Sequence, residues 1–316
     1  MKPGFRPSRW WRNAHLQTIW PVLTKPSHPQ ALNRQRLELT DGDFIDLDWQ
    51  RRPDHNAPLL LLVHGLEGSA DSHYMRRLLS DAENQSLAAV AMHQRSCSGE
   101  PNRLTRSYHS GASDDLMAVI TELKRQYPES PLWVVGYSLG GNQLVKYLGE
   151  QREYARVERA VVVSAPLDLA ACARRMERGF SRVYQTHLIG RLQQKTRDKL
   201  DQLPLTEQEL SRLKTFYQFD DRVTAPLNGF SGAEDYYQQA SGKAFLAHIA
   251  VPTLLLHAVD DPFMTEAVIP APDELSPSVE LELCPNGGHV GFIEGGWPWS
   301  PRYYLERRIL GYLAAT

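Results

Sequence analysis

Strand-length runs of apolar residues recur along the chain, and helical patterns separate them. The runs lie at residues 57–65, 86–93, 132–138, 159–166 and 251–261, and a further strand-like stretch, "VELELCP", follows at 279–285. Helical patterns lie at about 72–83, 113–127, 139–150 and 302–314. Continuous apolar strands are typical of a sheet that is buried on both faces. The alternation therefore predicts an α/β fold, with a mostly parallel sheet of about eight strands and helices on both sides.

Two regions depart from this alternation. The stretch around Asp41-Gly42 alternates between apolar and polar residues, which indicates an antiparallel hairpin. From about 168 to 247 the sequence is richer in charge, helical in pattern and without a strong buried strand. We interpret this block as a helical cap inserted over one end of the sheet. The predicted organisation is an aromatic N-terminal arm at 1–35 and one α/β domain at 36–316 that contains the cap.

Composition limits the classes of function. The 316 residues are 42% hydrophobic, and the net charge of −2 gives no reason to expect a nucleic acid or an anionic membrane surface as partner. The longest apolar run, 59–63, is far shorter than the ~20 residues of a membrane helix, so we expect no stable membrane insertion. No apolar segment of a secretory signal is visible either. The three cysteines form no CxxC site, and the 11 histidines show no zinc-ligand spacing. We expect a cytoplasmic protein that uses no metal or other cofactor.

The run at 132–138 ends in "GYSLG", the pattern G-x-S-x-G, where a helical pattern begins. A serine on such a tight strand-to-helix turn exposes its hydroxyl above the sheet, and the flanking glycines remove Cβ atoms that would clash. The helix N-terminus directs N–H groups at the same place, which suits a developing oxyanion. Ser138 is therefore predicted to be a nucleophile rather than an ordinary serine at a helix start.

A serine nucleophile needs a base and a carboxylate that orients the base, each just after a later strand. His289 follows the run at 279–285, and Asp260 and Asp261 follow "TLLLHA". The three residue types therefore occur in the order Ser, Asp, His. The two aspartates are hard to separate, since one can be a turn residue beside a proline; we favour Asp261 as the triad member.

The second oxyanion donor is expected in the loop "HGLEG" at 64–68. The backbone N–H groups of Leu66 and Leu139 are the natural pair for this role. His64 precedes the oxyanion residue, so we interpret it as a structural histidine that braces the loop rather than as a catalytic base.

Three further features allow two interpretations each. His109 and Asp114 form an H-x-x-x-x-D pattern that some acyltransferases use, but Ser113 or Asp114 can instead cap the following helix, which we favour. Aromatic residues of the arm could bind a lipid or a partner, but a strap over the sheet or cap is the commoner role: Trp10, Trp11, His15 and Trp20. Large residues of the cap could line an acyl pocket, but we expect core positions for most of them: Met176, Phe180, Tyr184, Phe216, Tyr217, Tyr236 and Tyr237.

Eight motifs, from about residue 13 to the last helix, together resemble the YheT-like group of α/β-hydrolases. That group includes ABHD-type ester hydrolases and the yeast medium-chain ester synthases/esterases. The motifs are "NAHLQTIWP", "HGLEGS", "RSCSGEPNR", "YHSGASDDL", "GYSLGGN", "FSRVYQ", "DDPFM" and "GGHVGFIEG". The resemblance implies an α/β-hydrolase fold and the triad Ser138, Asp261 and His289, which supports the second aspartate. The chain departs from the group at Ser96, where a glycine is more usual after the arginine, and this puts the local loop shape in question.

The resemblance also implies a cytosolic carboxylic-ester hydrolase that acts on short- to medium-chain acyl esters without a cofactor. In this hypothesis His289 deprotonates Ser138, and water cleaves the acyl-enzyme. One alternative is acyl transfer to an alcohol, which the yeast members and the H-x-x-x-x-D stretch motivate. Another is a binding protein that keeps a vestigial triad, and the complete set of catalytic parts argues against it. The expected partner is a small-molecule acyl ester.

Overall fold

The computed structural model describes residues 4–24 and 31–315. Eight strands form one sheet in the order β1-β2-β4-β3-β5-β6-β7-β8. Their bounds are β1 Asn33–Glu38, β2 Phe44–Arg51, β3 Leu59–Val63, β4 Ala88–Met92, β5 Leu132–Tyr137, β6 Arg159–Val163, β7 Thr253–Ala258 and β8 Val279–Cys284. The predicted hairpin is β1 and β2; β2 also pairs antiparallel with β4, and all the remaining pairs in this sheet are parallel. The prediction of a mostly parallel sheet of eight strands is confirmed.

The continuous apolar runs exist because the sheet is covered on both faces. All five residues of β3 are buried, with Leu59, Leu61 and Val63 in one core cluster and Leu60 and Leu62 in the other. Successive side chains of a strand point to opposite faces, so a strand buried on both sides must be apolar at every position.

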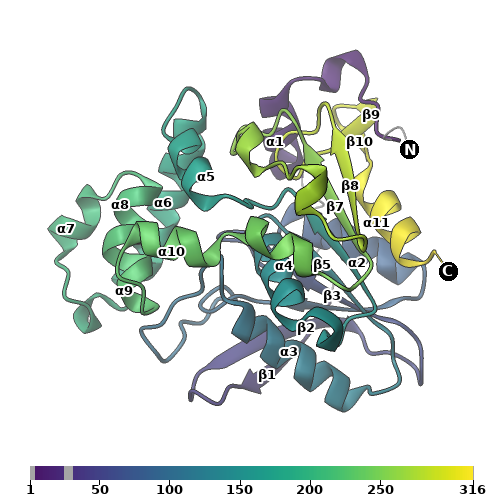
Figure 1. Ribbon diagram of the computed structural model, residues 1–316, viewed down its shortest axis with the longest axis horizontal. Helices are drawn as coiled ribbons and strands as arrows, with labels where there is room; N and C mark the ends of the chain where they lie inside the picture. The colour runs from purple at the N-terminus through teal and green to yellow at the C-terminus, as the bar shows by residue number, and fades with distance from the viewer. Residues whose placement is uncertain (1–3, 25–30, 316) are drawn as a thin grey trace.

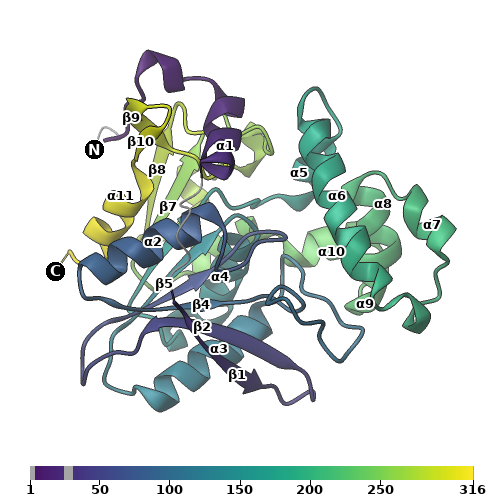
Figure 2. The same ribbon diagram turned by 180° about the vertical axis from the view of Figure 1, so that it is seen from behind.

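Four helices provide this cover. Helices α3 (Ser113–Gln126) and α4 (Leu139–Gln151) pack on one face, and α2 (His73–Asn84) and α11 (Leu305–Leu313) pack on the other. Figures 1 and 2, seen from opposite sides, show the two pairs on either side of the sheet. The layering leaves the carboxyl ends of the parallel strands free to carry loops.

A group of helices follows β6 and stands beside the sheet (Figure 1). Its α-helices are α5 Leu169–Met176, α6 Ser181–Arg197, α7 Glu207–Arg212, α8 Phe216–Phe219, α9 Ala225–Leu227 and α10 Ala233–Ala240. We call residues 169–240 the helical lobe. The lobe has two apolar clusters of its own, distinct from those of the sheet. The next segment, Gly242–His248, returns to the sheet, because Leu246 belongs to the core that α4 covers.

The N-terminal arm contains a helix, α1 (Ala14–Leu23), and packs against a small hairpin near the C-terminus. The hairpin strands are β9 Ile293–Trp297 and β10 Ser300–Tyr303. The Gln17 side chain joins arm and hairpin, since it donates to Ile293 O (3.0 Å) and accepts from Ile293 N (2.6 Å). The expectation that the closing helix starts near residue 302 is wrong, because β10 occupies residues 300–303 and α11 begins at Leu305. Among the described residues, no helix is both long and apolar enough to cross a bilayer.

Candidate active site

Ser138 lies at the junction of β5 and α4, in the turn that the sequence predicts. Its backbone has φ 51° and ψ −120°, a conformation that costs energy for a residue with a side chain. The neighbouring glycines permit this sharp turn. A Cβ on Gly136 would lie 2.6 Å from Gly140 O, and one on Gly140 would lie 2.5 Å from His64 O. A side chain at either position would therefore force the backbone around the turn to shift.

Ser138, His289 and Asp261 lie in one hydrogen-bonded chain. His289 Nε2 is 2.9 Å from Ser138 Oγ, and His289 Nδ1 is 2.8 Å from Asp261 Oδ2. Asp261 is 4% exposed and also accepts from Phe263 N (2.9 Å). The structure thus brings together the three residues that the sequence predicts from loops after β5, β7 and β8.

Asp260 turns away from the imidazole and supports the loop that carries it. Its carboxylate accepts from Gly288 N (2.9 Å) and Asn286 Nδ2 (3.2 Å). Burial is the main cause of the raised pKa of Asp260. The two aspartates that the sequence leaves hard to separate therefore have different surroundings, and Asp261 is the one in contact with His289.

Leu66 and Leu139 both border the cavity at Ser138. Leu139 is the first residue of α4, where backbone N–H groups have no acceptor within the helix. The amides on both sides of Leu66 are occupied: Gly65 N donates to Tyr74 Oη (3.0 Å) and Glu67 N to Tyr108 Oη (2.9 Å). Two tyrosines thereby fix the loop around Leu66.

His64 holds this loop in place, as expected of a structural histidine. The ring is fully buried; Nδ1 donates to Gly65 O (2.7 Å), and Nε2 accepts from Gln94 N (3.0 Å). Burial lowers the pKa of His64 to about 3, so the ring is neutral at physiological pH. A neutral ring with both nitrogens occupied has no proton to exchange with substrate.

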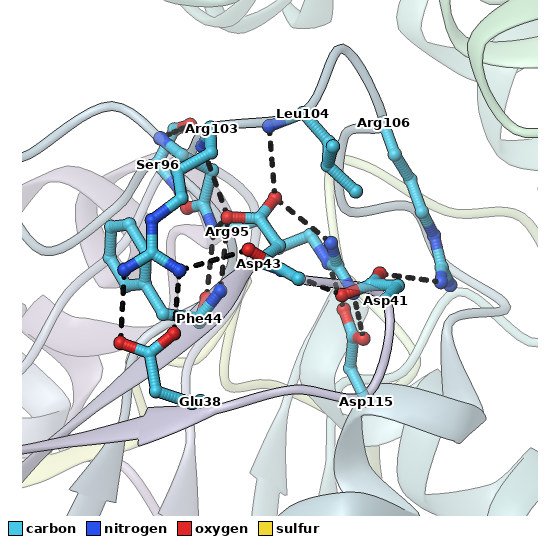
Figure 3. Close-up of polar contacts among 12 residues, drawn as sticks. Glu38, Asp41, Asp43, Phe44, Arg95, Ser96, Arg103, Leu104, Arg106 and Asp115 are labelled. Atoms are coloured by element: carbon cyan, nitrogen blue, oxygen red, sulfur yellow. Dashed lines mark hydrogen bonds and ion pairs between the residues drawn. The ribbon is translucent and has the colours of Figure 1, made fainter.

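The loop after β4, whose Gln94 N donates to His64, is held in place by the buried side chain of Arg95 (Figure 3). Its guanidinium donates to both carboxylate oxygens of Asp115 (2.8 and 2.7 Å) in α3. It also donates to Asp43 (3.0 Å) and Asp41 (2.7 Å) in the turn between β1 and β2. The antiparallel hairpin at the sheet edge is thus tied, through Arg95 and its neighbour Gln94, to the loop behind Ser138.

Ser96, the position where the chain departs from the resembled group, has φ +60°. This left-handed conformation suits glycine, which explains why glycine is more usual there. Here Ser96 Oγ accepts from Asn102 N (3.0 Å), and Ser96 N donates to Asn102 Oδ1. The reciprocal pair holds the loop in the shape that a glycine would otherwise allow.

His109 and Asp114 do not form a pair. Asp114 binds Arg106, His109 Nδ1 accepts from Gly111 N (3.1 Å), and no hydrogen bond of the described residues joins His109 to Asp114. The capping interpretation is also wrong, since α3 begins without a side-chain cap and Ser113 Oγ donates to Glu150 (2.6 Å). Burial lowers the pKa of His109 to about 4, so a neutral ring lines the cavity.

Comparison with known proteins identifies the family. A family model described as the alpha/beta hydrolase fold matches residues 58–296. The chain is 44% identical to the candidate esterase YheT of Escherichia coli (strain K12) over 315 residues, 98% of this chain and 92% of that protein. The chain belongs to the α/β-hydrolase fold family. Phospholipase ABHD3 of Mus musculus is 28% identical, over 93% of this chain and 74% of the relative.

A solved structure agrees at the level of the fold. The esterase Pf2001 of Pyrococcus furiosus aligns with a TM-score of 0.59 at 17% identity, over 99% of this chain and 96% of that one. The α/β-hydrolase fold is thereby confirmed. The 44% identical relative and the family model confirm the resemblance stated from the motifs and the ester-hydrolase class.

The cavity at Ser138 extends into the helical lobe of this α/β-hydrolase and has about 810 Å³ of empty space, part of it open to solvent. Of the large lobe residues named from the sequence, four line it: Met176, Phe216, Tyr236 and Tyr237. The expectation of core positions is wrong for Phe180 and Tyr217, which are 49% and 41% exposed. Ser138 and His289 also border a second, more open groove between α1 and α6.

Sequence reasoning assigned no role to several residues that hold the site. Thr18 of α1 accepts from His289 N (3.0 Å), and the Phe263 ring stacks on the His289 ring at 4.1 Å and 7°. Tyr108 fixes the loop of Leu66, as described above. All three residues lie inside motifs that carry the family resemblance, and their place in those motifs is the one sign in the sequence that they matter for the site.

Proposed function

We propose that this α/β-hydrolase cleaves carboxylic esters with short to medium acyl chains through a covalent acyl-enzyme on Ser138. The observation that carries the proposal is the chain from Ser138 Oγ to His289 (2.9 Å) and on to Asp261 (2.8 Å). Hydrogen-bonded nucleophile, base and orienting carboxylate are the arrangement that activates a serine hydroxyl.

The reaction runs in two halves. His289 Nε2 takes the proton of Ser138 as Oγ bonds to the acyl carbon; the proton then passes to the alkoxy oxygen as its bond to the acyl carbon breaks. Water next adds to the acyl carbon, giving its proton to Nε2, and Ser138 leaves with that proton. Asp261 keeps the ring oriented and stabilises the imidazolium. Each half restores the neutral ring, so the site returns to its starting state.

The negative charge that develops on the carbonyl oxygen needs donors in a fixed place. We assign this role to the amides of Leu66 and Leu139. The anchoring of Gly65 by Tyr74 and of Glu67 by Tyr108 supports the assignment, because a donor that is already in place costs no reorganisation during reaction.

The two openings at Ser138 suggest where the parts of the ester lie. We place the acyl chain in the apolar cavity that runs into the helical lobe, which would then act as a cap. The leaving alcohol lies toward the open groove between α1 and α6, which His187 and Arg191 border. An apolar cavity favours the hydrocarbon part of the ester because burial removes it from water.

The test is hydrolysis of p-nitrophenyl esters of increasing acyl length by the wild type and by Ser138→Ala. Removal of the nucleophile should lower kcat by about 10⁴-fold or more. Ser110→Ala is the matched control, because Ser110 also lines the cavity and its hydrogen bonds among the described residues go to Tyr236 and Asn142 rather than to the triad. It should retain turnover within about tenfold, a change of roughly 1.4 kcal/mol. Full activity of Ser138→Ala would refute the proposal.

Product analysis separates the alternatives. With ethanol present, a hydrolase releases mainly free acid, whereas an ethyl ester as the main product would indicate acyl transfer. Labelling of Ser138 by a fluorophosphonate without turnover of any ester would indicate a binding protein that keeps an assembled triad.

A further inference from the structure

One acidic side chain interrupts the apolar wall of the cavity that starts at Ser138. Asp220 lines the same cavity, in the part that the helical lobe forms. It begins a π-helical turn, Asp220–Thr224, between α8 and α9. Such turns are rare and occur often at functional sites. The cavity proposed to hold the acyl chain therefore contains a carboxyl group as well as hydrocarbon.

Asp220 is held by two neutral hydroxyl groups. Thr224 Oγ1 donates to Oδ1 (2.7 Å), and Tyr237 Oη donates to Oδ2 (2.8 Å). In the part of the chain that the structure describes, no lysine or arginine forms a salt bridge with this carboxylate. A carboxylate has about four acceptor positions, so each oxygen retains one that no described residue fills.

An ionised Asp220 with unfilled acceptor positions is unfavourable among aromatic side chains, and a ligand that donates a hydrogen bond would stabilise it. Phe216, Tyr236 and Tyr237 line the same part of the cavity, and the two tyrosine rings lie 5.4 Å apart. Burial raises the pKa of Asp220 to about 6, the direction expected for a carboxylate with few hydrogen-bond donors around it. A plain hydrocarbon chain offers the carboxylate nothing, whereas a hydrogen-bond donor would satisfy its free acceptor positions.

We propose that Asp220, Thr224 and Tyr237 form a subsite for a hydroxyl group on the acyl chain of the substrate. The proposal rests on the proposed ester hydrolysis at Ser138 and names its substrate class: esters of hydroxy-substituted acyl chains. The substrate hydroxyl donates to a free acceptor position of Asp220, and the hydroxyl oxygens of Thr224 and Tyr237 remain available as acceptors.

A hydroxyl fits this subsite better than a charged group. A substrate carboxylate would meet the charge of Asp220 at close range and be repelled. A substrate ammonium would have to lose its water in a mainly apolar cavity, and that penalty can exceed the gain from the ion pair. A hydroxyl is cheaper to desolvate and needs a single acceptor.

The experiment compares p-nitrophenyl esters in pairs, each pair being an unsubstituted acyl chain and its ω-hydroxy counterpart of equal length. The measured quantity is the ratio of kcat/KM, hydroxy over unsubstituted, across acyl lengths of roughly four to twelve carbons, with the longer chains nearing the medium range. For the wild type we expect this ratio to peak at one length, because the hydroxyl reaches Asp220 only there.

Asp220→Leu should lower the peak ratio by about 10- to 100-fold, the value of one hydrogen bond to a charged group. The ratio compares two esters in the same variant, so a general change in turnover cancels. Asp235→Leu, in α10 of the same lobe and outside the cavity lining, is the matched control and should keep the wild-type ratio.

Two results would overturn the proposal while the proposed function stands: a wild-type ratio without a peak, or an Asp220→Leu ratio equal to that of the wild type. The first needs no variant, so the test survives if Asp220→Leu fails to fold. Failure of the wild type to hydrolyse any unsubstituted ester would instead refute the proposed function itself.

Discussion

The sheet and the helical lobe contribute differently to the site. Ser138 and Asp261 lie on loops that follow β5 and β7, strands that are buried on both faces, and His289 lies on the loop that follows the partly buried edge strand β8. Much of the cavity wall instead comes from the lobe, which has separate apolar clusters. The proposed reactive groups thus rest on loops of the central sheet, and much of the proposed substrate-facing surface belongs to a part that packs largely on itself.

The two regions should therefore differ in the substitutions that they tolerate. Displacing a reacting group by about 1 Å can cost on the order of 100-fold in rate, so the sheet-borne loops need rigid support. The wall of a binding cavity sets which acyl chain fits, and its side chains can change without moving the triad. We therefore expect substitutions near the strands to affect turnover of every ester and substitutions in the lobe to affect selectivity.

The largest expected effect comes from Asp261→Asn. Asparagine keeps the shape but can hold His289 in the wrong tautomer, so kcat for p-nitrophenyl butyrate should fall by about 10⁴-fold. Asp260→Asn is the matched control one residue away; it loses charge but can still accept from Gly288, and kcat should fall by no more than about tenfold. Equal losses in the two variants would contradict the assignment of Asp261.

The chemistry of the site was more predictable from the sequence than its shape. Strands are continuous in the sequence, and the proposed triad residues stand within a few residues of their ends, so local patterns suffice to propose Ser138 and His289. Asp260 and Asp261 differ only in which way each side chain points, which depends on the loop of Gly288 far along the chain.

The contacts that shape the cavity are long-range and left little trace in local patterns. Thr18 reaches His289 across 271 residues, and Tyr236 contacts Ser110 across 126. Asp220 is an ordinary charged residue in a charged, helical stretch until the fold places it in the cavity. Neither periodicity nor composition can report such pairings.

Gly140→Ala tests the rigidity of the sheet-borne half. The new Cβ would lie 2.5 Å from His64 O and 2.6 Å from Val63 O, both backbone atoms that have no room to move. We expect a loss of about 3 kcal/mol in the free energy of unfolding, at the upper end for overpacked cores. Urea unfolding measures it, and a variant as stable as the wild type would show that the turn is looser than its contacts indicate.

Asp220→Asn tests the lobe through the pH dependence of stability. The pKa of Asp220 is raised from 3.8 to about 6, so between these values the folded state holds a proton that the unfolded state has lost. Its contribution to stability is therefore present at low pH and is lost as pH rises through about 6, by roughly 3 kcal/mol for about two pKa units. Asparagine does not titrate.

The measured quantity is the difference in unfolding free energy between Asp220→Asn and the wild type. It should move in favour of the variant by about 2.5 kcal/mol from pH 4 to 7.5, because the unfolded carboxyl is already partly ionised at pH 4. Other titrating groups are common to both proteins and cancel in the difference. Parallel pH profiles would mean that Asp220 is well solvated, which would weaken its assignment as a subsite.

The smallest expected effect is also the most direct comparison of the two regions, because it repeats the glycine-to-alanine change in the lobe. Gly190 lies within α6, and a Cβ there would meet no atom within 4 Å. Glycine inside a helix costs about 0.5–1 kcal/mol relative to alanine, so Gly190→Ala should stabilise the protein by that amount. Urea unfolding against Gly140→Ala should show opposite signs. Destabilisation at both positions would show that the lobe is packed as tightly as the strand loops, and the contrast between the two regions would fail.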